Sequence, residues 1–78
     1  MKLNYDPRYN IAYIRLSEKK GTVETLHISD ELNIDMSPNG SIYGIELLNA
    51  NEQLARGDDN QIVLVNDATG KHGVLTLE

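Results

Sequence analysis

Residues 5–16 join a tight turn directly to a strand, and this feature limits the fold of the chain more than any other. Asp6 and Pro7 favour a turn, because the proline ring holds φ near the value that the second turn position needs. The residues that follow, Ile11–Leu16, are mostly apolar, β-branched or aromatic, which is typical of a strand. Both sides of this strand are largely apolar, so we predict that it is the central strand of an antiparallel sheet.

Alternating apolar residues and turn signals extend this prediction along the chain. We expect one α+β domain over residues 1–78, made of an antiparallel meander of about five strands, one short helix and a C-terminal β-hairpin. Residues 1–56 form the meander and the helix, and residues 57–78 form the hairpin extension. Asn49 is expected to cap the helix, with Glu52 in a capping-box position. The predicted strands are Lys2–Tyr5, Asn10–Ser17, Val23–Ile28, Leu32–Ser37, Ile42–Leu48, Ile62–Val65 and Gly73–Leu77, and the predicted helix is Ala50–Arg56.

The hairpin that connects the fourth and fifth strands can take two registers. A three-residue loop would place Ile34 opposite Gly44, and a four-residue loop would place Ile34 opposite Tyr43. Since a slip of one residue exchanges the faces of a strand, only the four-residue loop brings the apolar residues of both strands to one face. We therefore predict the four-residue loop, which also places Leu32 opposite Ile45.

The small size of the chain makes self-association the expected additional source of stability. The sequence has 78 residues and contains no Phe, Trp or Cys. Ile, Leu and Val must therefore build the core, which supplies roughly 3–5 kcal/mol in a domain of this size. The run Ile62–Val65 is too apolar for a free sheet edge. We expect it to be buried within the subunit or at the interface of a homodimer.

The net charge of −5 restricts the kinds of partner. It argues against nonspecific binding to nucleic acid or to an anionic membrane, because both require a basic face. It is compatible with a small basic protein as partner. No apolar run approaches the roughly 20 residues of a membrane span, and the chain begins with a strand-like pattern rather than a signal peptide. We therefore expect a cytoplasmic protein.

Several short motifs resemble a known family in their order and spacing. They are Tyr5-Asp6, Tyr13-Ile14-Arg15-Leu16, Ile34-Asp35, Asn39-Gly40 and Gly44-Ile45-Glu46-Leu47-Leu48, followed by Ala50. The segment Lys2–Leu54 thereby resembles the small bacterial and archaeal proteins grouped as domain of unknown function 2283, although Asn10 stands where members often carry Asp. The resemblance implies no enzymatic activity and no catalytic residue. It implies a partner-binding or antitoxin-like role, because such proteins often neighbour toxin-like genes.

Titratable residues offer a different interpretation. Asp35 and Glu46 lie on adjacent predicted strands, and paired carboxylates can hold a metal or divide acid and base roles. The predicted register places Asp35 opposite Ile42 rather than Glu46, which favours a solvated face. His27 points away from the apolar side of its strand, and no nucleophile accompanies it. A metal or enzyme site at a dimer interface, built from Asp35, Glu46 and His27, remains the alternative.

Two further polar groups are interpreted as ordinary surface. His72 is expected in a turn. Asp58–Asn60 lacks the spaced ligands and the closing glutamate of a calcium loop. We therefore predict no cofactor and no metal.

Tyr13 and Arg15 are the best surface candidates, because Tyr and Arg are enriched at interface hot spots. Alternatively, the helix covers Tyr13, and Arg15 pairs across strands with Glu46 or Glu24. The predicted interaction residues are Tyr13, Arg15, Ile62 and Leu64. The sequence thus favours a non-catalytic protein-interaction module that works as a homodimer. A small-ligand binding domain with a closed apolar cavity is a further alternative.

Overall fold

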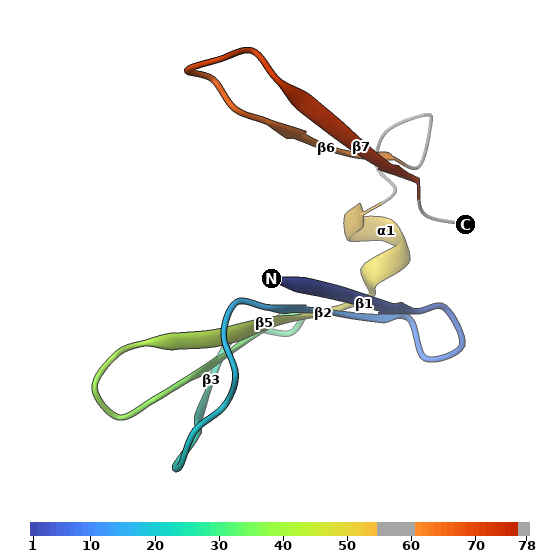
Figure 1. The fold of residues 1–78 in the computed structure, drawn as a ribbon. Coiled ribbons are helices and arrows are strands. Elements are labelled where there is room, and N and C mark those ends of the chain that lie inside the picture. Colours follow the sequence, from blue (N-terminus) through green and yellow to red (C-terminus); the bar gives the residue numbers. More distant parts are fainter. Residues whose placement is uncertain (55–60, 77–78) are drawn as a thin grey trace.

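Alternating apolar segments form strands in the computed structural model, which describes residues 1–54 and 61–76 (Figure 1). A five-stranded antiparallel sheet, one short helix and a two-stranded hairpin make an α+β fold, as the sequence predicts. Arg56 and Leu77, the predicted ends of the helix and of the last strand, lie outside the described residues. The elements are β1 (Lys2–Asp6), β2 (Ile11–Arg15), β3 (Glu24–Ser29), β4 (Leu32–Met36), β5 (Ile42–Leu48), α1 (Ala50–Leu54), β6 (Gln61–Val65) and β7 (His72–Thr76).

The strand order in the larger sheet is β1-β2-β5-β4-β3, which differs from the sequential order of a meander. β5 therefore takes the middle position that the sequence assigns to Ile11–Leu16, and β2 lies between β1 and β5. β2 and β5 alternate in the same way, so that Ala12 lies opposite Leu47 and Ile14 opposite Ile45. This match of apolar side chains favours the pairing and leaves β3 at the edge.

The turn between β4 and β5 is a three-residue loop. Ser37 N–H donates to the carbonyl oxygen of Ser41 at 2.8 Å, and Gly40 N–H donates to the carbonyl oxygen of Ser37 at 3.0 Å. Gly40 has a φ of 93°, a left-handed value that glycine adopts without a steric penalty. The predicted four-residue loop is therefore wrong.

A shift in register near the end of β4 compensates for the shorter loop. Beyond it, Ile34 lies opposite Ile45 rather than Tyr43, and Leu32 lies opposite Leu47 rather than Ile45. A bulge adds one residue to one strand, and one residue is enough to exchange the faces. The apolar side chains of the two strands thus share a face, as the sequence predicts, although the predicted pairs are wrong.

Asn49 holds the predicted N-cap position of α1, since its carbonyl oxygen accepts from Glu52 N–H and Gln53 N–H at 3.2 Å, but Asn10 supplies the side-chain cap. The backbone oxygen of Asn10 accepts from Ala50 N–H at 3.0 Å, and its side-chain Oδ1 accepts from Asn51 N–H at 2.6 Å. Asn49 has a left-handed φ of 53°, whereas an N-cap is usually extended, and its amide nitrogen donates to Glu52 Oε2. In the described part of the chain, no helix has the length and apolar character needed to cross a membrane.

The two faces of the five-stranded sheet differ in chemistry, because residues opposite one another in register share a face. One face, called the apolar face here, is mostly apolar and carries Leu3, Tyr5, Ala12, Ile14, Glu24, Leu26, Leu32, Ile34, Met36, Ile42, Ile45 and Leu47. The other, called the polar face, is mostly polar and carries Lys2, Asn4, Asp6, Ile11, Tyr13, Arg15, Thr25, His27, Asn33, Asp35, Glu46 and Leu48.

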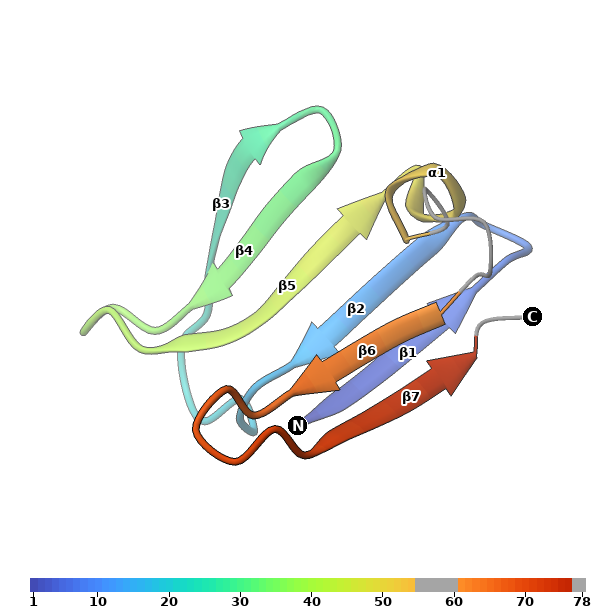
Figure 2. The ribbon, with the colours of Figure 1, turned by 90° about the horizontal axis from the view of Figure 1, so that it is seen from above.

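The hairpin β6–β7 lies beyond the apolar face, over β1 and β2 and away from β3 and β4 (Figures 1 and 2). Gly70 N–H donates to the carbonyl oxygen of Asn66 at 2.8 Å, and Gly70 has a φ of 74°. His72 is the first residue of β7, so its predicted place in the turn is wrong. The hairpin is a second, smaller layer that covers only part of the sheet.

The chain buries very few apolar side chains by itself. Within residues 1–54 and 61–76, the buried hydrophobic residues are Ala12, Tyr43 and Ala50. The larger Ile and Leu side chains of the apolar face are half-buried or exposed. The prediction that Ile, Leu and Val build a core within one chain is therefore wrong for the described residues, because only part of the apolar face has a second layer above it.

Candidate functional site

Asp35 is the centre of a hydrogen-bonded cluster on the polar face. Its Oδ2 accepts a hydrogen bond from Tyr13 Oη at 2.8 Å and lies 3.0 Å from Lys19 Nζ. Its Oδ1 accepts from Thr25 Oγ1 at 2.7 Å. The Asp35 side chain is only 14% exposed, so these three donors replace most of its water. The cluster ties together β2, β3, β4 and the segment after β2.

The donors fix the protonation states in this cluster. The hydrogen bond from Thr25, together with those from Lys19 and Tyr13, holds the pKa of Asp35 below its usual value and outweighs the opposing effect of burial. Burial raises the pKa of Tyr13, and the hydrogen bond to Asp35 raises it further. The hydrogen bond to Asp35 likewise raises the pKa of Lys19. At neutral pH the cluster is a satisfied carboxylate with charged and neutral donors, which suits cross-strand bonding rather than proton transfer.

Gly44 allows the phenol of Tyr13 to reach Asp35. Gly44 lies opposite Asp35 in β4, which corrects the predicted pairing with Ile42, and opposite Arg15 in β2. A Cβ atom at Gly44 would overlap the Tyr13 ring, so the ring crosses the backbone of β5 at this residue. The absence of a side chain in β5 therefore makes the contact between β2 and β4 possible.

A second row of hydrogen bonds crosses the polar face. His27 Nδ1 lies 2.8 Å from Asn33 Oδ1, and Asn33 Nδ2 donates to Glu46 Oε1 at 3.0 Å. Because the amide nitrogen of Asn33 faces Glu46, its oxygen faces the imidazole, which assigns the hydrogen of that bond to His27 Nδ1. His27 points away from the apolar face, as the sequence predicts.

The alternative site built from Asp35, Glu46 and His27 is not assembled within the chain. Asn33 lies between the side chains of His27 and Glu46, and Asp35 bonds a different set of donors. Among residues 1–54 and 61–76, no three His, Asp or Glu side chains are grouped so that they could hold a metal ion. Asp58–Asn60 lies outside the described residues.

Tyr13 and Arg15 lie on the polar face, opposite to the side on which α1 and the hairpin lie (Figure 1). The alternative in which α1 covers Tyr13 is therefore wrong, and Lys19 Nζ instead lies 5.1 Å from the centre of its ring. For Arg15 the described residues contain no ion pair, so the predicted pairing with Glu46 or Glu24 does not form. Both side chains line a hollow of about 450 Å³, together with Asn4, Glu18 and Lys19.

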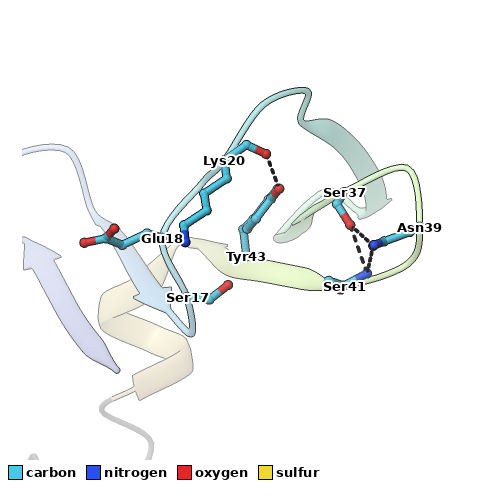
Figure 3. Close-up of a pocket in the computed structure, with 7 residues that line it drawn as sticks. All are labelled: Ser17, Glu18, Lys20, Ser37, Asn39, Ser41 and Tyr43. Carbon is cyan, nitrogen blue, oxygen red and sulfur yellow. Dashed lines mark hydrogen bonds between the residues drawn. The ribbon is translucent and has the colours of Figure 1, made fainter.

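A second hollow, of about 430 Å³, is lined largely by hydroxyl and amide groups (Figure 3). Its lining residues are Ser17, Glu18, Lys20, Ser37, Asn39, Ser41 and Tyr43. Tyr43 Oη donates to the carbonyl oxygen of Lys20 at 2.7 Å, and Ser37 Oγ donates to Asn39 Oδ1. The bond from Tyr43 to Lys20 holds the segment after β2 against β5, and the bond from Ser37 to Asn39 lies within the β4–β5 turn.

Acidic side chains gather where the β3–β4 turn meets α1. Asn49 Nδ2 donates to Glu31 Oε1 at 3.2 Å and to Glu52 Oε2 at 3.0 Å, which brings the two carboxylates together. Asp30 precedes Glu31 in the turn and is exposed. We call Asp30, Glu31 and Glu52 the acidic end.

The apolar face and the hairpin expose hydrophobic side chains that usually lie inside a protein. Leu26 is 42% exposed, Val63 is 51% exposed and Leu64 is 71% exposed, whereas Ile62 is half-buried. Between the hairpin and the sheet lies an open apolar cavity of about 450 Å³, which is lined by Met1, Leu3, Ile14, Ile62, Leu64, Gly73, Val74 and Leu75. Ile62 and Leu64, two of the predicted interaction residues, thus lie on an incompletely covered apolar surface.

Three residues with structural roles were missed by the sequence reasoning. Thr25 and Lys19 both bind Asp35, and Asn10 caps α1. Thr25 carried a usable signal, because it alternates with Leu26 and so belongs to the polar side of its strand. Asn10 has a φ of 58°, which asparagine tolerates better than most residues, but the sequence contains no sign of its distant partner.

Comparison with known proteins places these features in one family. The family described as "Protein of unknown function (DUF2283)" matches residues 2–51, which confirms the resemblance of the N-terminal segment. The match includes the five-stranded sheet and the beginning of α1, and β6 and β7 lie beyond it. No curated protein and no solved structure matches the chain.

Proposed function

Because the chain belongs to the DUF2283 family of proteins of unknown function, we propose a function from its own two sheet faces: a non-catalytic protein-interaction module of the cytoplasm. In this proposal the module works as a homodimer and binds a small basic protein, in the manner of an antitoxin. The exposed apolar face with its hairpin is the observation that carries the proposal.

Self-association follows from the amount of apolar surface that one chain leaves exposed. Large apolar side chains on both the sheet and the hairpin are about half-exposed in residues 1–54 and 61–76. Covering the exposed half of one such Leu, Ile or Val contributes about 1 kcal/mol, half of the value for a fully exposed side chain. Such side chains on both copies together outweigh the loss of freedom of the associating copies, so the apolar face supports a dimer.

The small basic partner follows from the charge. The chain carries a net charge of −5, and the carboxylates of Glu31 and Glu52 are held side by side at the acidic end. Adjacent like charges attract a lysine- or arginine-rich partner and speed its association. We place the basic partner at the acidic end, where it leaves the apolar face available for the second copy.

Light scattering and affinity capture test the two parts of the proposal. At micromolar concentration we expect a solution mass twice the 8.7 kDa of one chain, and a monomeric mass would refute self-association. Capture from the native cell is expected to yield a defined small basic protein. Glu31→Lys should weaken that capture, whereas Asp67→Lys, with the same charge change in the exposed hairpin turn, should not. Equal capture by both variants would exclude the acidic end as the binding site.

The apolar cavity between hairpin and sheet favours a second candidate function, the binding of a small apolar ligand. Its volume of about 450 Å³ lies within the range of small-molecule sites, and its lining is almost entirely apolar. An apolar fluorescent probe distinguishes the two functions. A ligand site binds the probe in the assembled protein and loses it in Ile14→Asp, whereas an interaction module without a ligand site does not bind the probe once it is assembled.

A further inference from the structure

Both faces of the hairpin carry apolar side chains, although the outer face also carries Gln61, His72 and Thr76. One face of the hairpin points toward the sheet and lines the cavity with Ile62, Leu64 and Leu75. The other face carries Val63, Val65 and Val74, of which Val74 also reaches the cavity. The valines of the other face are half-exposed, at 51% for Val63 and 51% for Val65. A near-continuous apolar run such as Ile62–Val65 in β6 is typical of a strand that is covered on both faces.

Part of the apolar face of the sheet has no second layer above it. The hairpin lies over β1 and β2 and leaves the apolar face of β3, β4 and the adjoining part of β5 uncovered (Figure 2). Leu26 of β3 is 42% exposed, and Ile34 and Ile45 are only half-buried. One chain therefore exposes two apolar surfaces. The outer face of its hairpin has no sheet packed against it, and the half-sheet of β3, β4 and β5 has no hairpin packed against it.

The dimensions of the chain indicate how much surface a partner covers. The chain exposes 5806 Å², about 1,100 Å² more than the roughly 4,700 Å² of a folded monomer of this mass. Its radius of gyration is 14.0 Å, compared with about 11.5 Å for a compact domain of this length. Two copies that bury this excess cover roughly 2,000 Å², at the lower limit of obligate homodimers.

We propose that a second copy of this chain completes the apolar face, with each hairpin lying between β1–β2 of its own chain and β3–β5 of the partner. This proposal rests on the self-association in the proposed function and specifies its geometry. The exposed hairpin face and the uncovered half-sheet belong to the same chain. In a two-fold symmetric dimer, the hairpin of each copy therefore contacts the half-sheet of the other, and both pairs of surfaces are covered.

Charge placement agrees with a second copy on this face. Each copy carries −5, so two copies repel one another wherever their acidic side chains meet. Asp35, Glu46 and Asp6 project from the polar face, away from the proposed contact. The contact is built mainly from Leu, Ile and Val, which carry no charge, although the exposed Glu24 of β3 also lies on this face.

The absence of cysteine from the sequence permits a clean crosslinking test. A tagged Val63→Cys chain is co-expressed with an untagged Leu26→Cys chain and treated with a short bismaleimide. We expect a crosslinked product of one tagged and one untagged chain. The matched control replaces Leu26→Cys with Lys2→Cys, an exposed position on the polar face of β1, and should give no such product.

The solution mass separates this proposal from the proposed function. A dimer that gives the Leu26–Val63 product supports both, whereas a dimer without that product overturns the hairpin arrangement and leaves self-association intact. A monomer overturns both. In addition, Val63→Lys should halve the solution mass, while Ala68→Lys, which adds the same charge at the hairpin turn, should preserve it. A dimeric Val63→Lys variant would count against the hairpin contact even if the crosslinking variants failed to fold.

Discussion

The polar and apolar faces of one sheet are completed in different ways. On the polar face, Asp35 is satisfied by three donors, and Asn33 joins His27 to Glu46. Among the described residues, no buried side-chain nitrogen or oxygen lacks a hydrogen-bond partner. On the apolar face, by contrast, the hairpin covers only β1 and β2, and Leu26 in the distant edge strand β3 is 42% exposed. The polar face forms its hydrogen bonds within one chain, whereas the apolar face is only partly covered by it.

This difference separates the contacts that determine strand register from those that determine assembly. A hydrogen bond contributes about 0.5–1.5 kcal/mol net, but its geometry selects one register. An apolar side chain contributes about 1.5–3 kcal/mol when it is covered, but it accepts many neighbours. We infer that Tyr13, Thr25 and Asp35 specify how the strands pair, and that the exposed leucines and valines provide the larger part of the stability when the copies associate.

A charge placed on either face is the strongest test of this comparison. Ile34 and Asn33 are neighbours in β4 and point to opposite faces. We expect Ile34→Lys to abolish the dimer and to lower the free energy of unfolding by more than about 3 kcal/mol, because it inserts a charge among apolar side chains. Asn33→Lys should cost about 1 kcal/mol or less, because the new ammonium group faces Glu46.

Denaturant unfolding at one fixed protomer concentration, together with the solution mass, measures both effects. Similar small effects for Ile34→Lys and Asn33→Lys would show that the apolar face is exposed in the working form of the protein. That result would remove the distinction between the faces.

The crossing of Tyr13 over β5 provides the next largest effect. A methyl group at Gly44 overlaps the Tyr13 ring, so Gly44→Ala should displace the phenol from Asp35 and cost about 1–3 kcal/mol. Gly73→Ala is the matched control, because a Cβ at Gly73 in β7 has no neighbour within 4 Å. We expect it to be neutral or slightly stabilising in denaturant unfolding. Equal stability of the two variants would show that the ring reaches Asp35 without crossing Gly44.

The sequence predicted the elements of the fold better than their arrangement. Alternation identified every strand among the described residues, because it reflects which side of each strand is apolar. The partner of each strand is a tertiary choice: β2 pairs with β5 because two apolar rows match, and no local signal encodes that match. The predicted register between β4 and β5 was wrong for a similar reason. A three-residue loop followed by a bulge brings the apolar side chains of both strands to one face, as the predicted four-residue loop would.

The sequence also predicted the apolar surface better than the polar contacts. Ile62 and Leu64 were selected as apolar surface residues because a run of four apolar residues can be seen in the sequence without knowing which residues it contacts. The alternative in which Arg15 pairs with a carboxylate was wrong, since residues near one another in register need not bond. The contact between Tyr13 and Asp35 depends on a glycine in the strand between them, and such a three-strand relation is visible only in the folded sheet.

Acidification tests whether Asp35 holds the polar face together. The folded state lowers the pKa of Asp35, so its contribution is present above the ordinary pKa of about 4 and is lost as the pH falls through the lower folded value. Asp35→Asn should therefore cost about 1–2 kcal/mol at neutral pH, and the difference from the natural sequence should shrink in acid. Tyr13→Phe removes one donor and should move the acid loss of stability to higher pH.

Unfolding free energies measured across this pH range give both results. A difference between the natural sequence and Asp35→Asn that stays constant into acid would mean that the carboxylate charge contributes nothing to the cluster. The stability of the polar face would then arise from packing of the Tyr13 ring alone.

The smallest effect concerns the ion pair at the margin of the same cluster. Lys19 Nζ lies 3.0 Å from Asp35 Oδ2, but the Lys19 side chain is 45% exposed, so water and salt screen the pair. We expect Lys19→Met to cost about 0.5 kcal/mol or less, and the cost to disappear at high salt. Arg8→Met, which removes the exposed pair with Asp6, is the control and should cause no measurable change. If Lys19→Met instead destabilised the protein as strongly as Gly44→Ala, the ammonium group rather than the crossing phenol would hold Asp35, and the polar face would depend on its edge rather than on its centre.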